Sequence, residues 1–279
     1  MSGRFEGRRV LVTGGARGQG RNHALRFARE GADVAVVDLA AEEMETVAYP
    51  LGSRAELEET AAMVEAEGRR AAALVADIRS LEQMEAAVGQ AVEVFGGLDV
   101  LVVNAGICTF GELATMSAET WGTMIDVNLT GAFNTVRAAV PHIYGSEAGR
   151  VVATSSMAGR AGWENIGHYA AAKWGLIGMV KSLALELAPR GITANVVCPS
   201  SVDTTMMKNE ASYKLFRPDL ENPTLEDALP AFQSVNVLPV PYAEPDDISD
   251  AVLFLASDQA RYITGATLSA AIGVNAKNI

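Results

Sequence analysis

The sequence predicts an α/β protein: one doubly wound domain in which a parallel sheet carries helices on both faces. Short apolar runs alternate with stretches of helical periodicity along the chain. The runs are continuously apolar, as expected for strands that are buried on both faces. With 279 residues, 49% of them hydrophobic and 20% charged, the chain can bury a large core. No internal repeat or linker divides it, so we expect a single domain over residues 1–279.

The first half of the predicted sheet begins close to the N-terminus. Residues 9–13 form a short apolar β-rich run, and a glycine-rich turn at 14–20 leads into a helical pattern through Ala24 and Phe27. The apolar run at 33–38 is the second strand. Next come a loop at 40–53 with Pro50-Leu51-Gly52, helices at 54–67 and 80–95, and strands at 71–77 and 98–104.

The second half continues the alternation until the periodicity fails. One long helix is expected over 118–144, in which Gly131 is tolerated at some cost. Residues 200–244 contain five prolines and no clear period, which indicates a substrate loop or lid. The remaining elements are strands at 150–156, 193–199 and 266–270, and helices from about 169 to 188 and from 246 to 257.

The glycine-rich turn has the context of a dinucleotide-binding loop. A strand precedes Gly14-Gly15-Ala16-Arg17-Gly18-Gln19-Gly20 and a helix follows it. Glycines permit a tight turn and close backbone approach, and the new helix points its free N–H groups at a phosphate. The spacing is GxxxGxG, not the commoner GxGxxG, and a glycine pattern alone is also consistent with a turn or with helix packing.

The end of the second strand indicates which dinucleotide is bound. Asp38 lies 20 residues after Gly18, where an acid can bind the adenosine ribose hydroxyls. Its charge repels a 2′-phosphate, and the following Leu39 is not basic, so we expect NAD and not NADP. Arg17 is the observation against this choice, because a glycine-loop arginine could contact an added phosphate.

A tyrosine and a lysine on one helix face predict acid–base chemistry. Tyr169 and Lys173 are four residues apart and share a face. A phenol has a pKa near ~10, and an ammonium one turn away should lower it toward the working range of a base. Ser156 ends a predicted strand and adds a hydroxyl donor. The three side chains predict alcohol–carbonyl interconversion, although a YxxxK pair alone would equally fit an ordinary surface helix.

Ligands of doubly wound sheets bind beyond the carboxyl ends of the strands. We therefore expect one crevice that gathers the residues at those ends, namely Gly14–Gly20, Asp38, Asp77, Asn104, Ser156 and Pro199. Two of them have simpler interpretations. Asp77 could cap a turn, and Asn104 could be a turn residue that needs a positive φ.

These motifs resemble those of the short-chain dehydrogenase/reductase family over essentially the whole chain. Thr13–Gly20 resembles its TGxxxGxG loop, Asn104-Ala105-Gly106 resembles its NAG turn, and Ser156, Tyr169 and Lys173 match its catalytic spacing. The resemblance implies a Rossmann-type domain with seven parallel strands in the order 3-2-1-4-5-6-7, and a homotetramer.

The resemblance also implies a set of site residues. Asn128 would complete the catalytic set and hold a water that links Lys173 to solvent, although it could also be an asparagine that kinks a helix. The implied cofactor contacts are Gly14, Arg17, Gly18, Gln19, Gly20, Asp38, Leu39, Asp77, Ile78, Asn104, Ala105, Gly106, Tyr169, Lys173, Pro199, Val202 and Thr204.

A narrower resemblance, to the carveol dehydrogenase-type branch described as mycofactocin-coupled, is carried by Tyr49-Pro50-Leu51-Gly52 and by residues 215–224. It implies NAD-dependent interconversion of a hydrophobic secondary alcohol, such as carveol, with its ketone. It also implies a tightly held nicotinamide that a mycofactocin-type redox carrier re-oxidises in place. A lid over the substrate, unless it is ordinary core packing, would use Met206, Met207, Tyr213, Leu215 and Phe216, with Trp163 and Ile166 lining the same pocket.

Two positions depart from the family pattern. Pro199-Ser200 replaces its Pro-Gly, so the turn on the nicotinamide side could differ. The C-terminal stretch after Leu268 lacks the family's acid, which puts the usual C-terminal subunit contact in doubt. Neither change touches the catalytic set.

Charge and composition exclude several classes of partner. The net charge of −12 disfavours nucleic acid and anionic membranes, and no apolar stretch reaches the ~20 residues that span a bilayer. With two cysteines, three scattered histidines and no apolar N-terminal leader, we expect no metal site and a cytoplasmic location. The alternatives are an NADPH-dependent ketoreductase of the 3-oxoacyl type and, with less support, a non-catalytic NAD(H)-binding protein.

Overall fold

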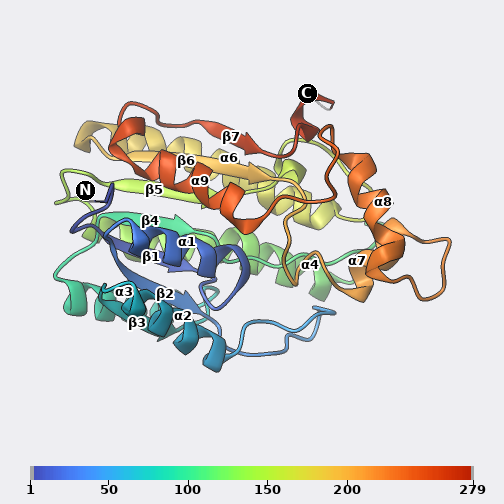
Figure 1. Cartoon of the computed structure of the whole chain (residues 1–279), viewed down its shortest axis with the longest axis horizontal. Helices are drawn as coiled ribbons and strands as arrows, with labels where there is room; N and C mark the ends of the chain where they lie inside the picture. Colours follow the sequence, from blue (N-terminus) through green and yellow to red (C-terminus); the bar gives the residue numbers. More distant parts are fainter. Residues whose placement is uncertain (1–2, 278–279) are drawn as a thin grey trace.

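The computed structural model describes residues 3–277 and confirms a seven-stranded parallel sheet (Figure 1). The strand order is β3-β2-β1-β4-β5-β6-β7, as predicted, and each neighbouring pair is parallel. Residues 1, 2, 278 and 279 of the predicted domain lie outside the described residues. The strands are β1 (Arg9–Thr13), β2 (Asp33–Asp38), β3 (Ala71–Val75), β4 (Val100–Val103), β5 (Arg150–Thr154), β6 (Thr193–Pro199) and β7 (Thr267–Ala270).

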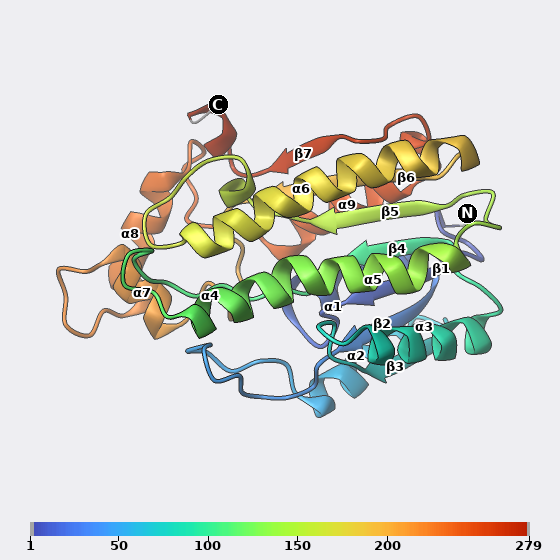
Figure 2. The same cartoon turned by 180° about the vertical axis from the view of Figure 1, so that it is seen from behind.

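Helices cover both faces of this sheet. Outside residues 200–244, the α-helices of the described chain are α1 (Gly18–Arg29), α2 (Arg54–Ala66), α3 (Leu81–Phe95), α4 (Ala118–Ile125), α5 (Gly131–Ala139), α6 (Gly167–Leu187) and α9 (Pro245–Ala256). Helices α1, α2 and α9 pack on one face (Figure 1), and α3, α5 and α6 pack on the other (Figure 2). In β1, Val10 and Val12 point to the first face and Leu11 to the second. Burial on both faces explains the continuously apolar strands.

The long helix predicted over 118–144 is interrupted. Helix α4 ends at Ile125, a π-helical turn follows at Asp126–Thr130, and α5 then begins at Gly131. The amide Nδ2 of Asn128 donates to the carbonyl oxygen of Met124 at 3.1 Å, and a Cβ added at Gly131 would lie 2.6 Å from Cγ1 of Ile78. Single π-helical turns within α-helices occur frequently at functional sites.

The prediction of irregular structure throughout 200–244 is wrong in part, because the segment contains α7 (Glu210–Phe216) and α8 (Leu225–Val235). Helix α7 is too short for a clear period, and α8 contains Pro230, a residue that disfavours helix interiors. Each has a side-chain cap, however: Asn209 accepts from the N–H of Ser212, and Thr224 begins a capping box. Both helices stand at the carboxyl ends of the strands (Figures 1 and 2).

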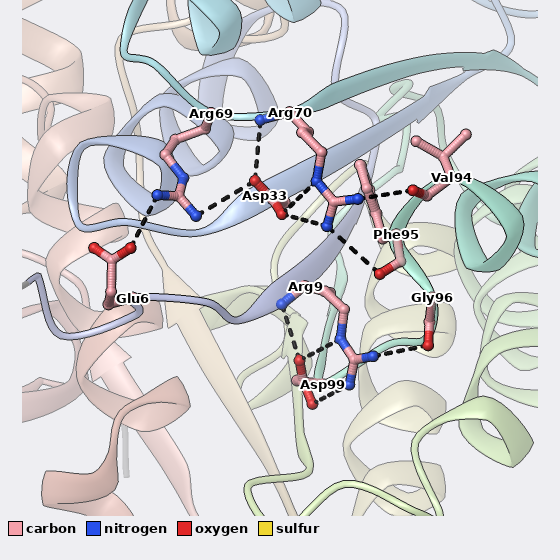
Figure 3. Close-up of polar contacts among 9 residues, drawn as sticks. All are labelled: Glu6, Arg9, Asp33, Arg69, Arg70, Val94, Phe95, Gly96 and Asp99. Carbon is pink, nitrogen blue, oxygen red and sulfur yellow. Dashed lines mark hydrogen bonds and ion pairs between the residues drawn. The ribbon is translucent and has the colours of Figure 1, made fainter.

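At the opposite edge of the sheet, two arginine–aspartate pairs hold the amino ends of the strands (Figure 3). Asp99 accepts from Nε and Nη2 of Arg9 at 2.8 and 2.9 Å, and Asp33 accepts from Nε and Nη2 of Arg70 at 2.8 and 2.7 Å. Burial alone would raise the pKa of Asp99, but hydrogen bonds from Arg9 and Ser146 hold it below its usual value.

Replacing Asp99 with Asn should lower the free energy of unfolding at neutral pH by about 3 kcal/mol, because Arg9 loses a nearly buried charged partner. The folded-state pKa of Asp99 is depressed, so its stabilisation is present above about pH 4 and is lost as the pH falls through the folded value. Urea unfolding below pH 4 should therefore show a weaker pH dependence for Asp99→Asn than for the wild type.

The matched control is Asp250→Asn, since Asp250 forms an exposed pair with Arg26. We expect its effect to stay below about 1 kcal/mol. An Asp99→Asn protein with the wild-type pH dependence of stability would contradict the role given to this carboxylate.

Candidate active site

Two adjoining cavities open at the carboxyl ends of the strands. The first, of about 180 Å³, is bordered by the glycine loop and is called the glycine-loop cavity. The second, of about 480 Å³, contains Tyr169 and is called the tyrosine cavity. Both are lined by Gln19, Asn104, Gly106, Thr204 and Met206, so the two cavities are continuous. Every catalytic and cofactor-contact residue predicted from the sequence lines one or both of them.

The glycine loop has the geometry of a phosphate cradle. Gly14 and Gly18 have φ values of +70° and +57°, in the left-handed region that favours glycine. A Cβ added at Gly20 would lie 1.9 Å from the carbonyl oxygen of Gly14, so only glycine fits this turn. Helix α1 starts here without a side-chain cap from Arg17, which leaves N–H groups of its first turn available to an anion.

Asp38 ends β2 at the wall of the glycine-loop cavity. Its Oδ2 accepts from the N–H of Ala16 at 3.0 Å, and its Oδ1 accepts from the N–H of Ala40 at 3.4 Å. Burial raises the pKa of Asp38, although these backbone donors oppose the shift. The carboxylate is therefore fixed in place at the edge of the cavity.

Further along the same cavity, the simpler interpretation of Asn104 is not supported. Asn104 is not among the described non-glycine residues with positive φ. Its Nδ2 donates to the carbonyl oxygen of Thr13 at 3.0 Å, which ties the ends of β1 and β4 together. Asp77 both caps a turn and lines the cavity: its Oδ1 accepts from the N–H of Arg79, and Nη2 of Arg79 pairs with Oδ2 at 2.7 Å.

In the tyrosine cavity, Lys173 is buried and Tyr169 lies beside it, partly buried. Nζ of Lys173 is 5.5 Å from the centroid of the Tyr169 ring and donates to the carbonyl oxygen of Thr154 at 3.0 Å. Burial lowers the pKa of Lys173 to about 8. Burial also raises the pKa of Tyr169, and a hydrogen bond with Ser156 opposes this rise.

The direction of the Tyr169 shift is opposite to the lowering that the spacing predicted. The spacing places the ammonium correctly, but it does not report burial. An apolar surrounding removes hydration from a phenolate and so favours the neutral phenol. Burial also favours the neutral amine of Lys173. Less of the positive charge that was expected to lower the pKa of Tyr169 is therefore present.

Asn128 and Lys173 both lie next to Gly106. The side chain is 1% exposed, its Oδ1 accepts from the N–H of Ile107 at 3.3 Å, and its Nδ2 donates to the Ile107 carbonyl at 3.0 Å. A Cβ added at Gly106 would lie 2.6 Å from Oδ1 of Asn128 and 3.4 Å from Nζ of Lys173. The π-helical turn therefore brings Oδ1 of Asn128 and Nζ of Lys173 to the same side of Gly106, and the role of Asn128 in a proton path stays a prediction.

The walls of the tyrosine cavity are mostly apolar. The predicted lining residues Trp163, Ile166, Met206, Met207, Leu215 and Phe216 all contribute. Tyr213 does not line the cavity and instead faces Phe232, with ring centroids 6.4 Å apart. Ser200 is not among the described residues with positive φ, so serine fits the turn without strain.

Sequence reasoning assigned no role in the site to Tyr49, Cys108 or Val274. Tyr49, in the segment between β2 and α2, is 6% exposed and lines the glycine-loop cavity, and its hydroxyl oxygen accepts from the N–H of Cys108 at 3.0 Å. Cys108 lines the tyrosine cavity, where burial raises the pKa of its thiol to about 12. Val274, 1% exposed, brings the C-terminal segment into the same cavity. Of these residues, only Tyr49 had a signal in the sequence, because it lies in the inserted segment Tyr49-Pro50-Leu51-Gly52.

Three properties of the described residues bear on ligands and location. Within residues 3–277, no group of three or more His, Cys, Asp or Glu side chains is arranged to hold a metal ion. The helices of the same range include none that is long and apolar enough to cross a membrane. Cys108 and Cys198 are both free thiols.

Comparison with known proteins gives matches over nearly the whole chain. A family model described as short chain dehydrogenase matches residues 8–214. A (-)-trans-carveol dehydrogenase from Rhodococcus erythropolis is 48% identical over 98% of this chain and 99% of that protein. A trans-4-hydroxycyclohexanecarboxylate dehydrogenase from Sinomonas cyclohexanicum is 37% identical over 100% of this chain and 96% of that protein. The crystal structure of carveol dehydrogenase from Mycobacterium avium in complex with NAD matches with a TM-score of 0.96 and 45% identity, covering 98% and 99% of the two chains.

Proposed function

The chain belongs to the short-chain dehydrogenase family, and we propose that it is an NAD-dependent oxidoreductase that interconverts a hydrophobic secondary alcohol, carveol or a similar cyclic alcohol, with its ketone. One observation carries this proposal. Ser156, Tyr169 and Lys173 line an apolar cavity of about 480 Å³ that is continuous with the glycine-loop cavity.

The residues of the glycine-loop cavity fit NAD. The uncapped start of α1 and the glycine turn suit a pyrophosphate, and the fixed carboxylate of Asp38 suits the adenosine ribose hydroxyls. Asp77 and Ile78 border the end of the cavity where an adenine would lie. When bound, the nicotinamide supplies the hydride acceptor or donor.

In the oxidation direction, the phenol of Tyr169 passes its own proton toward the amine of Lys173 and takes the proton of the substrate hydroxyl as the general base. Ser156 donates a hydrogen bond to the substrate oxygen, which orients it and stabilises the charge that develops there. Lys173, whose pKa burial lowers to about 8, can exchange a proton near neutral pH. Asn128 holds a water beside Lys173 and so connects the pair with solvent. The apolar walls exclude bulk water from the reacting atoms.

The cavity favours a neutral substrate. Lys173 is the only lysine or arginine among its described lining residues, and Glu164 adds a negative charge. A carboxylate on the substrate would lose its hydration without gaining a free cationic partner. Carveol should therefore be oxidised with a kcat/KM at least roughly tenfold above that for trans-4-hydroxycyclohexanecarboxylate. Comparable values for the two alcohols in a steady-state assay would refute the neutral-substrate assignment.

We further propose that the nicotinamide stays bound between turnovers and is re-oxidised in place by a redox carrier of the mycofactocin type. The segment between β2 and α2 supports this, because Met44, Tyr49, Leu51 and Gly52 all contribute to the wall of the glycine-loop cavity. The hydrogen bond from the N–H of Cys108 to Tyr49 fastens this segment to the loop that follows β4.

Replacing Tyr49 with Phe should speed the release of the bound nucleotide about fivefold, because one hydrogen bond contributes about 1 kcal/mol. The rate is measured by diluting the protein into a nucleotide-consuming enzyme and following the nucleotide that leaves. Tyr144→Phe, at an exposed tyrosine, is the matched control and should release at the wild-type rate. Equal release from Tyr49→Phe and wild type would argue against the Tyr49 contact as a fastener.

We also propose a homotetramer in the cytoplasm. Three large apolar side chains on α4, α5 and α6 support self-association, since Trp121, Phe133 and Trp174 are 42, 46 and 53% exposed. The two free thiols suit a reducing compartment. Light scattering that gave the mass of a single chain would overturn the tetramer.

A further inference from the structure

We propose that Glu56 is a second determinant of cofactor choice. By pairing with the Arg17 guanidinium, Glu56 keeps it from binding the 2′-phosphate of NADP, while Asp38 repels the same phosphate. This inference rests on the proposed NAD site. It goes beyond it by assigning a role in specificity to a residue of α2.

Arg17 is the reason why Asp38 alone is an incomplete barrier. Among the described residues that line the glycine-loop cavity, Arg17 is the only lysine or arginine. It lies close enough to Asp38 for its positive charge to lower the pKa of that carboxyl, against the raising effect of burial. A guanidinium beside the ribose position could bind a 2′-phosphate and offset the repulsion from Asp38.

Glu56, in the first turn of α2, also lies near this guanidinium. Its Oε1 lies 3.9 Å from Nη1 of Arg17, and the two side chains are 35 and 24% exposed. The carboxylate is held in position by the capping box of α2. Its Oε2 accepts from the N–H of Ser53 at 2.8 Å, and the hydroxyl of Ser53 accepts from the N–H of Glu56 at 3.2 Å. One carboxylate oxygen thus fixes the side chain, and the other is directed to Arg17.

Gly52 explains how α2 comes so close to the cofactor cavity. A Cβ added at Gly52 would lie 2.6 Å from Cβ of Ala16 and 3.4 Å from Oδ1 of Asp38. The absence of a side chain lets the start of α2 pack directly over the end of β2. Asp38 and Glu56 therefore both lie near Arg17, one at the end of β2 and the other in the first turn of α2.

This arrangement predicts how the two acids combine. A 2′-phosphate that pairs with Arg17 must displace Glu56 and tolerate Asp38. Neutralising Asp38 leaves Arg17 engaged with Glu56, and neutralising Glu56 leaves the repulsion from Asp38. Only removal of both charges leaves the guanidinium free in a site without a competing anion. The change in the NADP to NAD binding ratio of the double variant should therefore exceed the product of the changes in the two single variants.

The test is a cycle of Asp38→Asn, Glu56→Gln and the double variant. Glutamine still serves a capping box, so Glu56→Gln removes the charge and retains the start of α2. Each protein is incubated with equal NAD⁺ and NADP⁺ until the bound composition is constant. It is then freed of unbound nucleotide, and the nucleotide released by acid is identified by mass spectrometry. This readout does not depend on activity.

We expect the wild type and both single variants to carry mainly NAD. The bound NADP to NAD ratio of the double variant should exceed the product of the two single effects by about tenfold, a coupling of about 1.4 kcal/mol. In an Arg17→Leu background, Glu56→Gln should leave the ratio unchanged. Glu59→Gln is the matched control, because Glu59 lies on the same helix but pairs with Arg21 at 2.7 Å.

The inference would be overturned if the change in the NADP to NAD ratio of the double variant equalled the product of the two single changes. It would also be overturned if Asp38→Asn alone produced the full change. A Glu56→Gln effect that persists without Arg17 would also overturn it. A wild-type protein that carries NAD while the coupling is absent refutes only this inference. A wild type that carries NADP or no nucleotide refutes the proposed NAD-dependent function as well.

Discussion

Replacing Tyr169 with Phe should lower the turnover of a secondary alcohol by about a thousandfold, while the amount of nucleotide bound per subunit stays unchanged. The substitution removes the hydroxyl that is proposed to exchange a proton with the substrate oxygen and keeps the ring that lies beside Lys173. Steady-state kinetics and nucleotide quantification on the same preparation separate the loss of chemistry from the loss of binding.

Tyr213→Phe is the matched control for this experiment. Tyr213 belongs to α7 near the same cavity, but it faces Phe232 and does not line the cavity. Its hydroxyl should be dispensable, so turnover should remain within a few-fold of wild type. A Tyr169→Phe protein that turned over within about tenfold of wild type would remove the tyrosine from the role of acid and base.

Replacing Gly20 with Ala should abolish nucleotide binding. The added Cβ would lie 1.9 Å from the carbonyl oxygen of Gly14, and backbone cannot move aside as a flexible side chain can. The glycine turn would have to open, and the first turn of α1 would no longer meet a phosphate. Nucleotide released from the purified protein measures the effect directly.

Gly89→Ala provides the control in α3. A Cβ at Gly89 meets no atom of the described chain within 4 Å. Alanine is also the better helix former, so this variant should keep its nucleotide and gain up to about 1 kcal/mol of stability. Full nucleotide occupancy in a folded Gly20→Ala protein would contradict the cradle assigned to this loop.

The sequence allowed prediction of those site residues that lie at the carboxyl ends of strands. Asp38, Asn104 and Pro199 each follow a continuous apolar run, and parallel strands bring such positions to one edge of a sheet. The residues at these strand ends could therefore be predicted without coordinates, whereas the strand order and the full set of cofactor contacts came from the resemblance to a known family.

Contacts between distant segments could not be predicted in this way. The bond between Tyr49 and Cys108 joins residues 59 positions apart, and nothing in the local pattern of either residue indicates the other. Helix α7 was missed because seven residues do not establish a period. The direction of the Tyr169 pKa shift was wrong because spacing reports neighbours, whereas burial depends on the whole fold.

The most direct test of the proposed function is an anaerobic time course of nicotinamide reduction by carveol in the presence of a large excess of NAD⁺. We predict a rapid burst of reduced nicotinamide, stoichiometric with the subunits, that then stops because the bound cofactor awaits an external carrier. Continuous accumulation of NADH would contradict the retained cofactor and indicate an ordinary exchanging dehydrogenase. The absence of any reduction would contradict the assignment of carveol-like secondary alcohols as substrates.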